Sequence, residues 1–263
     1  MSIAPSQTPI ETRNRACDDI TCRTTPLYVV CSPQRCVGKT LLARLLTEFY
    51  IIDGRPVATF DLADEEPQLS DYLPQCTTIA DISDILGQMA LFDRPIADHQ
   101  STKIIDLSHR MFSDFFIVGH KIGFFEEARR RSIEPLILFM IDPSPKSAQA
   151  YAILRRWFTE VSLLPVRNQV VAKGIPRCDS FSNESTVAVS LEIPVLGASL
   201  KTLVNQQSFS FADFWLRTTP VHLPARLDDE LLAWVKRVFL QFREVELSLM
   251  GREILSTLQS QVK

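Results

Sequence analysis

The sequence predicts an α/β protein whose mainly parallel sheet is doubly wound, with helices on both faces. Two observations support this prediction. Short apolar runs alternate with helical patterns along most of the chain, and alternating strands and helices favour a parallel sheet. The chain also has 263 residues, of which 46% are hydrophobic, and this is enough to bury a full core.

The predicted strands are short and rich in Val, Ile, Leu or Phe, which is typical of strands buried in a parallel sheet. They are Leu27–Cys31, Val57–Phe60, Lys103–Leu107, Leu136–Ile141, Val161–Val166 and Thr186–Leu191. Other segments have apolar residues at helical spacing. These predicted helices are Thr40–Ile52, Gln75–Met89, Phe115–Arg131, Lys146–Thr159 and Asp228 to about Leu258. We expect the first helix to end at Asp53-Gly54, because glycine tolerates the left-handed conformation found after a helix.

The pattern predicts a single domain over residues 25–263 that ends in the long C-terminal helix. Residues 1–24 are polar and have no period of 2 or 3.6, so we expect a flexible N-terminal tail. Gly174–Ser185 is polar and rich in turn formers, which predicts an exposed loop. The aromatic residues of Met111–Phe125 are expected to pack in the core.

Charge and cysteine content indicate the surroundings of the protein. The net charge of −3 argues against a basic nucleic-acid-binding surface over the whole molecule. The six cysteines form no disulfide framework, which favours a reducing compartment. The first residues do not have the pattern of a secretory signal, and no apolar stretch approaches the ~20 residues that span a bilayer. We therefore expect a soluble, cytoplasmic protein.

The segment Leu27–Phe49 has the order strand, short loop, Gly-Lys-Thr, helix, which is the arrangement of a phosphate-binding loop. In such a loop, backbone N–H groups point at an anion, Lys39 reaches the β- and γ-phosphates, and the Thr40 hydroxyl can hold Mg²⁺. The pattern G-x-x-x-x-G-K-[ST] is incomplete, because Pro33 takes the place of its first glycine and has no N–H group. The alternative is a strand-to-helix turn that binds no ligand. The residues expected to cradle phosphate are Arg35, Cys36, Val37, Gly38, Lys39 and Thr40.

Acidic residues stand near the ends of two predicted strands, where doubly wound folds place their ligands. Asp106 could hold the Mg²⁺ of a bound nucleotide, directly or through water, or it could cap the next helix. Asp61 and Asp64 follow the second predicted strand. They could position water or Mg²⁺, or they could belong to a solvated acidic loop.

These motifs together resemble the ParA/MinD family of ATPases. Gln34–Thr40 is similar to their K-G-G-V-G-K-T loop, and Asp61–Ser70 is similar to their D-x-D-P-Q-G-x-x-S segment. Ile104–Asp106 resembles their second acidic motif, and Leu136–Ser147 resembles a later strand that ends in a proline-containing loop. Val161–Asn168 resembles the strand whose terminal Asn contributes to adenine recognition. The resemblance extends from about residue 26 to about residue 205. It implies that the single domain predicted over residues 25–263 is P-loop NTPase-like.

The resemblance implies a slow-hydrolysing switch ATPase that binds ATP and Mg²⁺ and acts as a homodimer in partitioning, positioning or assembling a cellular cargo. Combined with the motifs, it gives three groups of candidate site residues. These are Lys39, Asp61 and Asp64 for catalysis, Thr40 and Asp106 for the metal, and Asn168 for adenine. The residues indicate no particular cargo or adaptor protein, and contact with DNA or a membrane surface has no support in them.

The sequence departs from the family pattern in three places. Gln34 takes the position of the loop lysine that family members extend across the dimer interface, although Arg35 is adjacent. Arg35 and Cys36 replace two glycines, and Ala63 replaces the second Asp of D-x-D, with Asp64 one residue later. Nucleotide binding tolerates such changes better than hydrolysis does. The alternative function is therefore a catalytically inactive nucleotide-binding adaptor, and a metabolic P-loop ligase or kinase is a further alternative.

Overall fold

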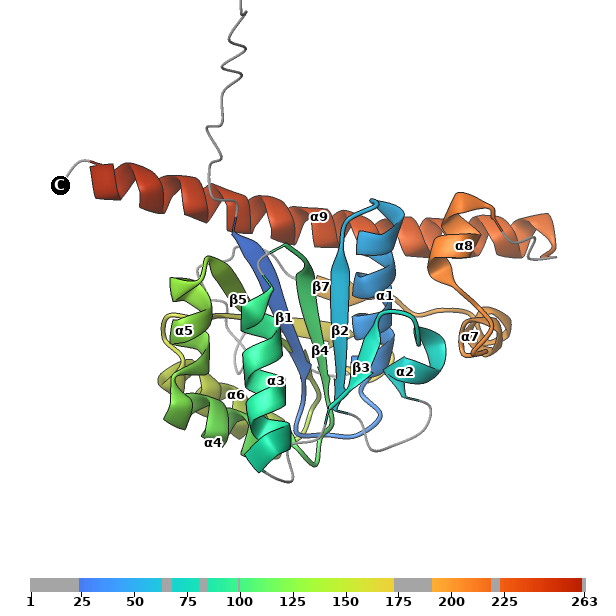
Figure 1. The fold of residues 1–263 in the computed structure, drawn as a ribbon. Helices are drawn as coiled ribbons and strands as arrows, with labels where there is room; N and C mark the ends of the chain where they lie inside the picture. Colours follow the sequence, from blue (N-terminus) through green and yellow to red (C-terminus); the bar gives the residue numbers. More distant parts are fainter. Residues whose placement is uncertain are drawn as a thin grey trace, which may run out of the picture.

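The computed structural model describes residues 24–62, 68–80, 85–98, 100–172, 191–218 and 223–261. These residues form one parallel sheet between two layers of helices (Figure 1). The expected tail, the expected loop Gly174–Ser185 and the candidate residue Asp64 lie outside the described residues. The expectations for them, and the single-domain division of the chain, stay predictions.

Within the described residues the sheet has seven strands, all parallel, in the order β3-β2-β4-β1-β5-β6-β7. They are β1 (Thr25–Cys31), β2 (Val57–Leu62), β3 (Thr77–Ile79), β4 (Thr102–Leu107), β5 (Ile133–Ile141), β6 (Ser162–Asn168) and β7 (Leu191–Ile193). The central strand is β1, with β4 on one side and β5 on the other. The predicted doubly wound α/β fold is confirmed. The carboxyl end of β1 lies where the strand order reverses, and such folds bind ligands at this point.

Nine helices are present in the described part of the chain. They are α1 (Lys39–Ile52), α2 (Leu69–Tyr72), α3 (Ile85–Ala97), α4 (Phe112–Ile122), α5 (Phe124–Arg130), α6 (Pro145–Trp157), α7 (Ala198–Val204), α8 (Phe211–Leu216) and α9 (Ala225–Gln261). Two apolar clusters separate them into layers: α1, α2 and α7 to α9 share one cluster, and α3 to α6 share the other. Along β1, Tyr28 and Val30 join the first cluster while Leu27 and Val29 join the second, as the two-residue period of a strand requires.

The long helix α9 crosses the layer that contains α1 (Figure 1). The indole nitrogen of Trp234 donates a hydrogen bond to the carbonyl of Pro194, after β7, at 2.9 Å. The ring centroids of Phe239 and Phe242 lie 5.4 and 5.6 Å from that of Phe49 on α1. The predicted C-terminal helix therefore packs against α1 and the end of β7. In the described part of the chain, no helix combines the length and apolar character needed to cross a membrane.

The predicted helix Gln75–Met89 is wrong in its first part, because that part contains the edge strand β3. The backbone N–H of Thr59 on β2 donates to the carbonyl of Cys76 at 2.9 Å. The Thr59 hydroxyl lies 2.6 Å from the hydroxyl of Thr77. Pairing with β2 satisfies these backbone groups, and β-branched residues suit a strand, so this contact outweighs the weak helical periodicity.

The single predicted helix Phe115–Arg131 is also wrong, because two helices, α4 and α5, occupy this region. Gly123 separates them with a φ of +67°, which glycine adopts without steric cost. The expected burial of the aromatic residues in this region is confirmed. They are Phe112, Phe115, Phe116, Phe124 and Phe125.

Strand boundaries that differ from the sequence pattern change the position of two candidate residues, Asp61 and Asn168. Strand β2 extends two residues further than predicted, to Leu62, so Asp61 lies inside the strand. Strand β6 extends to Asn168, which becomes its last residue. The predicted strand Thr186–Leu191 shares only Leu191 with β7, and the rest of that prediction lies outside the described residues.

Candidate functional site

The loop that connects β1 to α1 contains two residues with positive φ. Gly38, at the N-terminus of α1, has a φ of +99°, and Cys36 has a φ of +58°. The left-handed conformation costs a non-glycine residue roughly 1–2 kcal/mol, and such strain often marks functional sites. Alternating backbone conformations of this kind form concavities in which successive N–H groups face an anion. The loop thus has the backbone form of an anion cradle at the start of a helix.

The Lys39 side chain folds back over this loop, where its ammonium donates a hydrogen bond to the carbonyl of Gln34 at 2.9 Å. The Gln34 side chain in turn donates to the hydroxyl of Ser144, at the start of α6, at 3.0 Å. The Gln34 N–H group donates to Ser32 at 3.2 Å. Gln34, which stands where the resembling family has its interface lysine, is therefore held by contacts within the chain.

The two residues predicted to hold the metal ion, Thr40 and Asp106, lie together in the structure. Thr40, in the first turn of α1, forms a side-chain hydrogen bond with Asp106 near the end of β4. The pKa of the Asp106 carboxyl is raised to about 7. Burial is the largest cause, the Thr40 hydrogen bond works against it, and the nearby charge of Asp61 adds to it. Its second oxygen is buried and has no partner among the described residues. A carboxylate and a hydroxyl are oxygen ligands of the kind Mg²⁺ prefers, so these residues fit that ion.

Asp61 lies next to Asp106, because the two residues are register partners on β2 and β4. Its side chain is fully buried, so it does not belong to a solvated loop. The carboxylate accepts a hydrogen bond from the Ser70 N–H group at 2.9 Å, and this contact ties the start of α2 to the site. The structure thus places two carboxylates side by side at the carboxyl edge of the sheet.

Asn168, the last residue of β6, contacts the loop from the opposite side. Its amide nitrogen donates to the carbonyl of Val37 at 3.0 Å, and its oxygen accepts from the Val170 N–H group at 3.1 Å. The side chain is buried, with 8% of its surface exposed. The structure therefore brings Asn168 to the loop, and it does so through backbone contacts within the chain.

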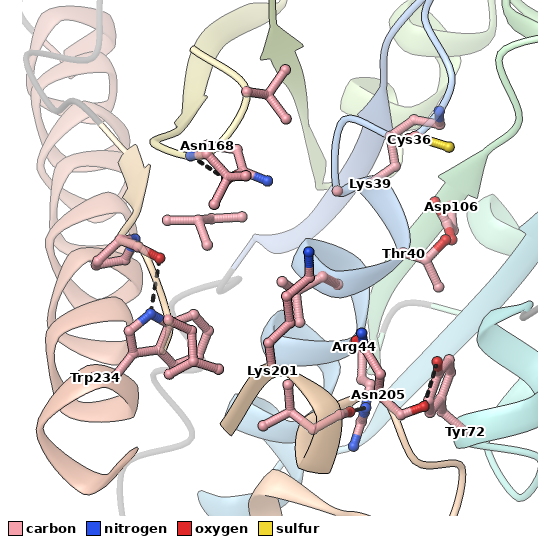
Figure 2. A pocket seen from close by; sticks show the side chains of 18 of the residues that line it. Cys36, Lys39, Thr40, Arg44, Tyr72, Asp106, Asn168, Lys201, Asn205 and Trp234 are labelled. Atoms are coloured by element: carbon pink, nitrogen blue, oxygen red, sulfur yellow. Dashed lines mark hydrogen bonds between the residues drawn. The ribbon is translucent and has the colours of Figure 1, made fainter. Parts of the chain in front are cut away.

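A cavity of about 610 Å³ opens beside the loop and extends to α7 and α9 (Figure 2). Cys36, Gly38, Lys39 and Thr40 form part of its wall, together with Asp106 and Asn168. Arg35 and Val37, which the sequence also places in the cradle, and Asp61 are not among the residues that line it. The sequence motifs missed several other side chains of the wall. They are Arg44, Tyr72, Pro194, Lys201, Asn205 and Trp234.

Arg44 and Glu48 on α1 form a buried ion pair at 3.0 Å below this cavity. Arg44 also donates to the carbonyl of Val204 at 2.6 Å and to the carbonyl of Phe209. Glu48 accepts hydrogen bonds from the Ser210 hydroxyl at 2.7 Å and from a backbone N–H group of α8 at 2.8 Å. The pair therefore fixes α7 and α8 against the helix that carries the phosphate-loop motif.

The sequence contains a signal for this pair but not for the rest of the wall. Two opposite charges four residues apart on an otherwise apolar helix face indicate a buried pair rather than a solvated one. Lys201 and Trp234 have no such local pattern. Only the fold brings α7 and α9 to the cavity.

The fold and the loop together define a class: a doubly wound, P-loop NTPase-like α/β fold, with Gly-Lys-Thr at the carboxyl end of its central strand. No protein-family model and no curated protein matches the sequence. Among solved structures, the chain is similar to a chain of the MinC:MinD cell division protein complex from Aquifex aeolicus. The two chains are 12% identical, the TM-score is 0.47, and the match covers 81% of this chain and 94% of that one. The fold class rests on the strand order and the loop rather than on this likeness.

Proposed function

We propose that this chain is an ATP- and Mg²⁺-binding P-loop protein of the ParA/MinD type, which hydrolyses ATP slowly and acts as a homodimeric switch. The proposed task is the partitioning, positioning or assembly of a cellular cargo. The observation that carries the proposal is the placement of Asp106. This buried carboxyl group, with one oxygen that has no partner among the described residues, meets Thr40 in the first turn after the Gly-Lys-Thr loop.

Each residue then has a defined role. The backbone from Arg35 to Thr40 would cradle the phosphates, and the Lys39 ammonium would leave the Gln34 carbonyl for the β- and γ-phosphates. Thr40 and Asp106 would hold Mg²⁺, which when bound neutralises phosphate charge. Asp61, the register partner of Asp106 on the neighbouring strand, would orient water around the ion. Asn168, whose side chain donates a hydrogen bond to the Val37 carbonyl of the loop, would contact the base.

The two leading alternatives are a slow ATPase and an adaptor that binds nucleotide without hydrolysing it. They differ in whether ATP is turned over. The Gln34 side chain is hydrogen bonded to Ser144 of its own subunit, whereas the resembling family uses a lysine at this position across the dimer interface. Such a contact favours slow hydrolysis, or an adaptor that binds nucleotide without turnover. Single-turnover hydrolysis with purified protein separates these: a rate at background with intact binding supports the adaptor.

Calorimetric titration with ATP and Mg²⁺ tests the central claim. Wild type should bind, and Lys39→Ala should lose most of its affinity, because the ammonium contacts the phosphates directly. Lys121→Ala is the matched control, since Lys121 is an exposed lysine on α4, in the opposite helix layer. If wild type and Lys39→Ala bind equally poorly while both are folded, the proposal is wrong.

Light scattering of the eluted protein, with and without ATP and Mg²⁺, tests the dimer. A nucleotide-dependent doubling of the mass is expected. A monomeric mass in both conditions would contradict the proposed homodimeric switch. Nucleotide binding would then be judged by the calorimetric titration alone.

A further inference from the structure

The side chain of Lys201 extends from α7 into the cavity that contains the phosphate loop (Figure 2). Helix α7 begins after Gly197 and is held firmly in place. Leu200 and Val204, one helical turn apart, are 1% and 2% exposed in the apolar core. The Val204 carbonyl also accepts a hydrogen bond from Arg44. The backbone that carries Lys201 is therefore anchored to α1, the helix that begins at the loop.

The other lysine and arginine side chains of the cavity wall, Lys39 and Arg44, each have hydrogen-bond partners within the protein. Arg44 is paired with Glu48 and donates to two carbonyl groups, so its donors are directed into the core. Lys39 donates to the Gln34 carbonyl. Lys201 differs from both, because its ammonium has no ion pair or hydrogen bond with any residue that the structure describes.

The charges of the cavity are unbalanced toward positive. Asp106 is the one carboxyl group among the described lining residues, whereas Lys39, Arg44 and Lys201 carry positive charge. A bound nucleoside triphosphate with one Mg²⁺ retains net negative charge after the metal is counted, and Lys39 offsets only part of it. The Lys201 ammonium, as a second positive charge in the same cavity, would therefore favour an anionic ligand of this kind over a neutral or cationic ligand.

We propose that Lys201 is a second phosphate-binding residue, which contacts the phosphate chain of the bound nucleotide from the α7 side of the cavity. This inference rests on the proposed nucleotide-binding function and deepens it. It makes the site selective for polyphosphate-bearing ligands over nucleosides. It also means that α7 supplies a positive charge to the site, whereas the loop has the uncharged Gln34 at the position where the resembling family has a lysine.

Lys201→Met, which keeps most of the side-chain length and removes the charge, tests the inference. Affinity for ATP with Mg²⁺ and for ADP with Mg²⁺ should fall about tenfold to a hundredfold, the equivalent of one lost charge-assisted hydrogen bond. Lys201→Arg should retain most of the affinity. Because exposed charges are screened by salt, binding by Lys201→Met should also depend less on ionic strength than binding by wild type. Lys236→Met, on the exposed side of α9, is the matched control and should change neither property.

Two probes separate this inference from the proposed function. Inorganic tripolyphosphate tests the phosphate contact alone, and adenosine tests the base side alone. If wild type binds tripolyphosphate and Lys201→Met does not, the inference holds even where no nucleotide binds and the proposed function fails. If Lys201→Met binds ATP and tripolyphosphate as wild type does, or loses adenosine and ATP affinity to the same degree, the inference is overturned. If wild type binds neither ATP nor tripolyphosphate, both proposals fail.

Discussion

The side chain of Asn168 occupies the space that a side chain at position 38 would need. A Cβ atom built on Gly38 lies 2.7 Å from the amide nitrogen of Asn168, which is closer than real Cβ contacts come. The same amide donates to the Val37 carbonyl at 3.0 Å. The end of β6 therefore closes tightly on the phosphate loop, and the φ of +99° at position 38 adds a second reason for glycine there.

We predict that Gly38→Ala destabilises the protein by about 1–3 kcal/mol, because it adds left-handed strain and pushes Asn168 from the loop. Affinity for ATP with Mg²⁺ should fall by at least about tenfold, since displaced N–H groups no longer face the phosphates. Urea unfolding and calorimetry measure the two effects.

Gly54→Ala provides the control for backbone strain alone. Gly54 also has positive φ, at +65°, but a Cβ atom there would meet nothing within 4 Å. The Gly54→Ala variant should therefore lose some stability and keep its affinity for ATP with Mg²⁺. Asn168→Ala removes the clash but also loses the hydrogen bonds of this side chain, so it serves as the background for a second measurement. Gly38→Ala should cost less stability in the Asn168→Ala variant than in wild type. An equal cost in both would show that the contact with Asn168 is not the cause.

The parallel α/β fold and the loop were predictable because their signals are local. The strands of the sheet core are continuous apolar runs, and Gly38-Lys39-Thr40 directly precedes an apolar helical pattern. Asp106 was found for the same reason, as a charge inside an apolar run. The edge strand β3 was missed because its pairing with Thr59 is tertiary, and a three-residue strand has little pattern of its own.

The far wall of the cavity was not predictable in the same way. Lys201 and Trp234 come from helices that follow the sheet, and their positions depend on how α7 and α9 dock on α1. One buried ion pair, Arg44 with Glu48, decides much of that docking. A sequence pattern can indicate that such a pair is buried. It does not indicate which distant carbonyl groups the pair will hold.

Breaking that ion pair should loosen the cavity wall. We predict that Arg44→Met destabilises the protein by about 3–5 kcal/mol, because the Glu48 carboxylate, 0% exposed, loses its charge partner. Two carbonyl groups of the α7–α8 region also lose their donor. Urea unfolding measures the total, and hydrogen exchange should show faster exchange in Ala198–Leu216 than elsewhere in the domain.

The surface pair Arg131 and Glu127 has the same spacing of four residues and is the matched control. Arg131→Met should leave stability nearly unchanged, since solvent screens an exposed pair. If Arg44→Met were equally mild, or if hydrogen exchange rose uniformly over the domain, the ion pair would not be what holds α7 and α8 on α1.

The raised pKa of Asp106 predicts a dependence of stability on pH. Its carboxyl has a pKa of about 7 in the folded protein, against 3.8 for the exposed group. Between these values the folded state keeps a proton that the unfolded chain releases. This contribution to stability is therefore complete below about pH 4 and is lost as the pH rises to about 7.

Asp106→Asn removes this titration and keeps the shape of the side chain. Without metal, its melting temperature should exceed that of wild type at about pH 8, and the two should converge near pH 4. Its ATP binding should no longer respond to Mg²⁺. Asp114→Asn, at an exposed position on α4, should follow wild type at every pH. Parallel melting curves for Asp106→Asn and wild type from pH 4 to about pH 8 would contradict the assignment.

Trp234 should report ligand binding directly, because it lines the cavity and is 6% exposed. The other two tryptophans lie elsewhere: Trp157 stacks on His120 in the opposite layer, and Trp215 packs beside Phe239. In a variant with Trp157→Phe and Trp215→Phe, titration with ATP and Mg²⁺ should change the emission and saturate at the calorimetric dissociation constant. Adding Lys39→Ala should abolish the change. Saturable calorimetric binding with constant Trp234 emission would place the nucleotide outside this cavity.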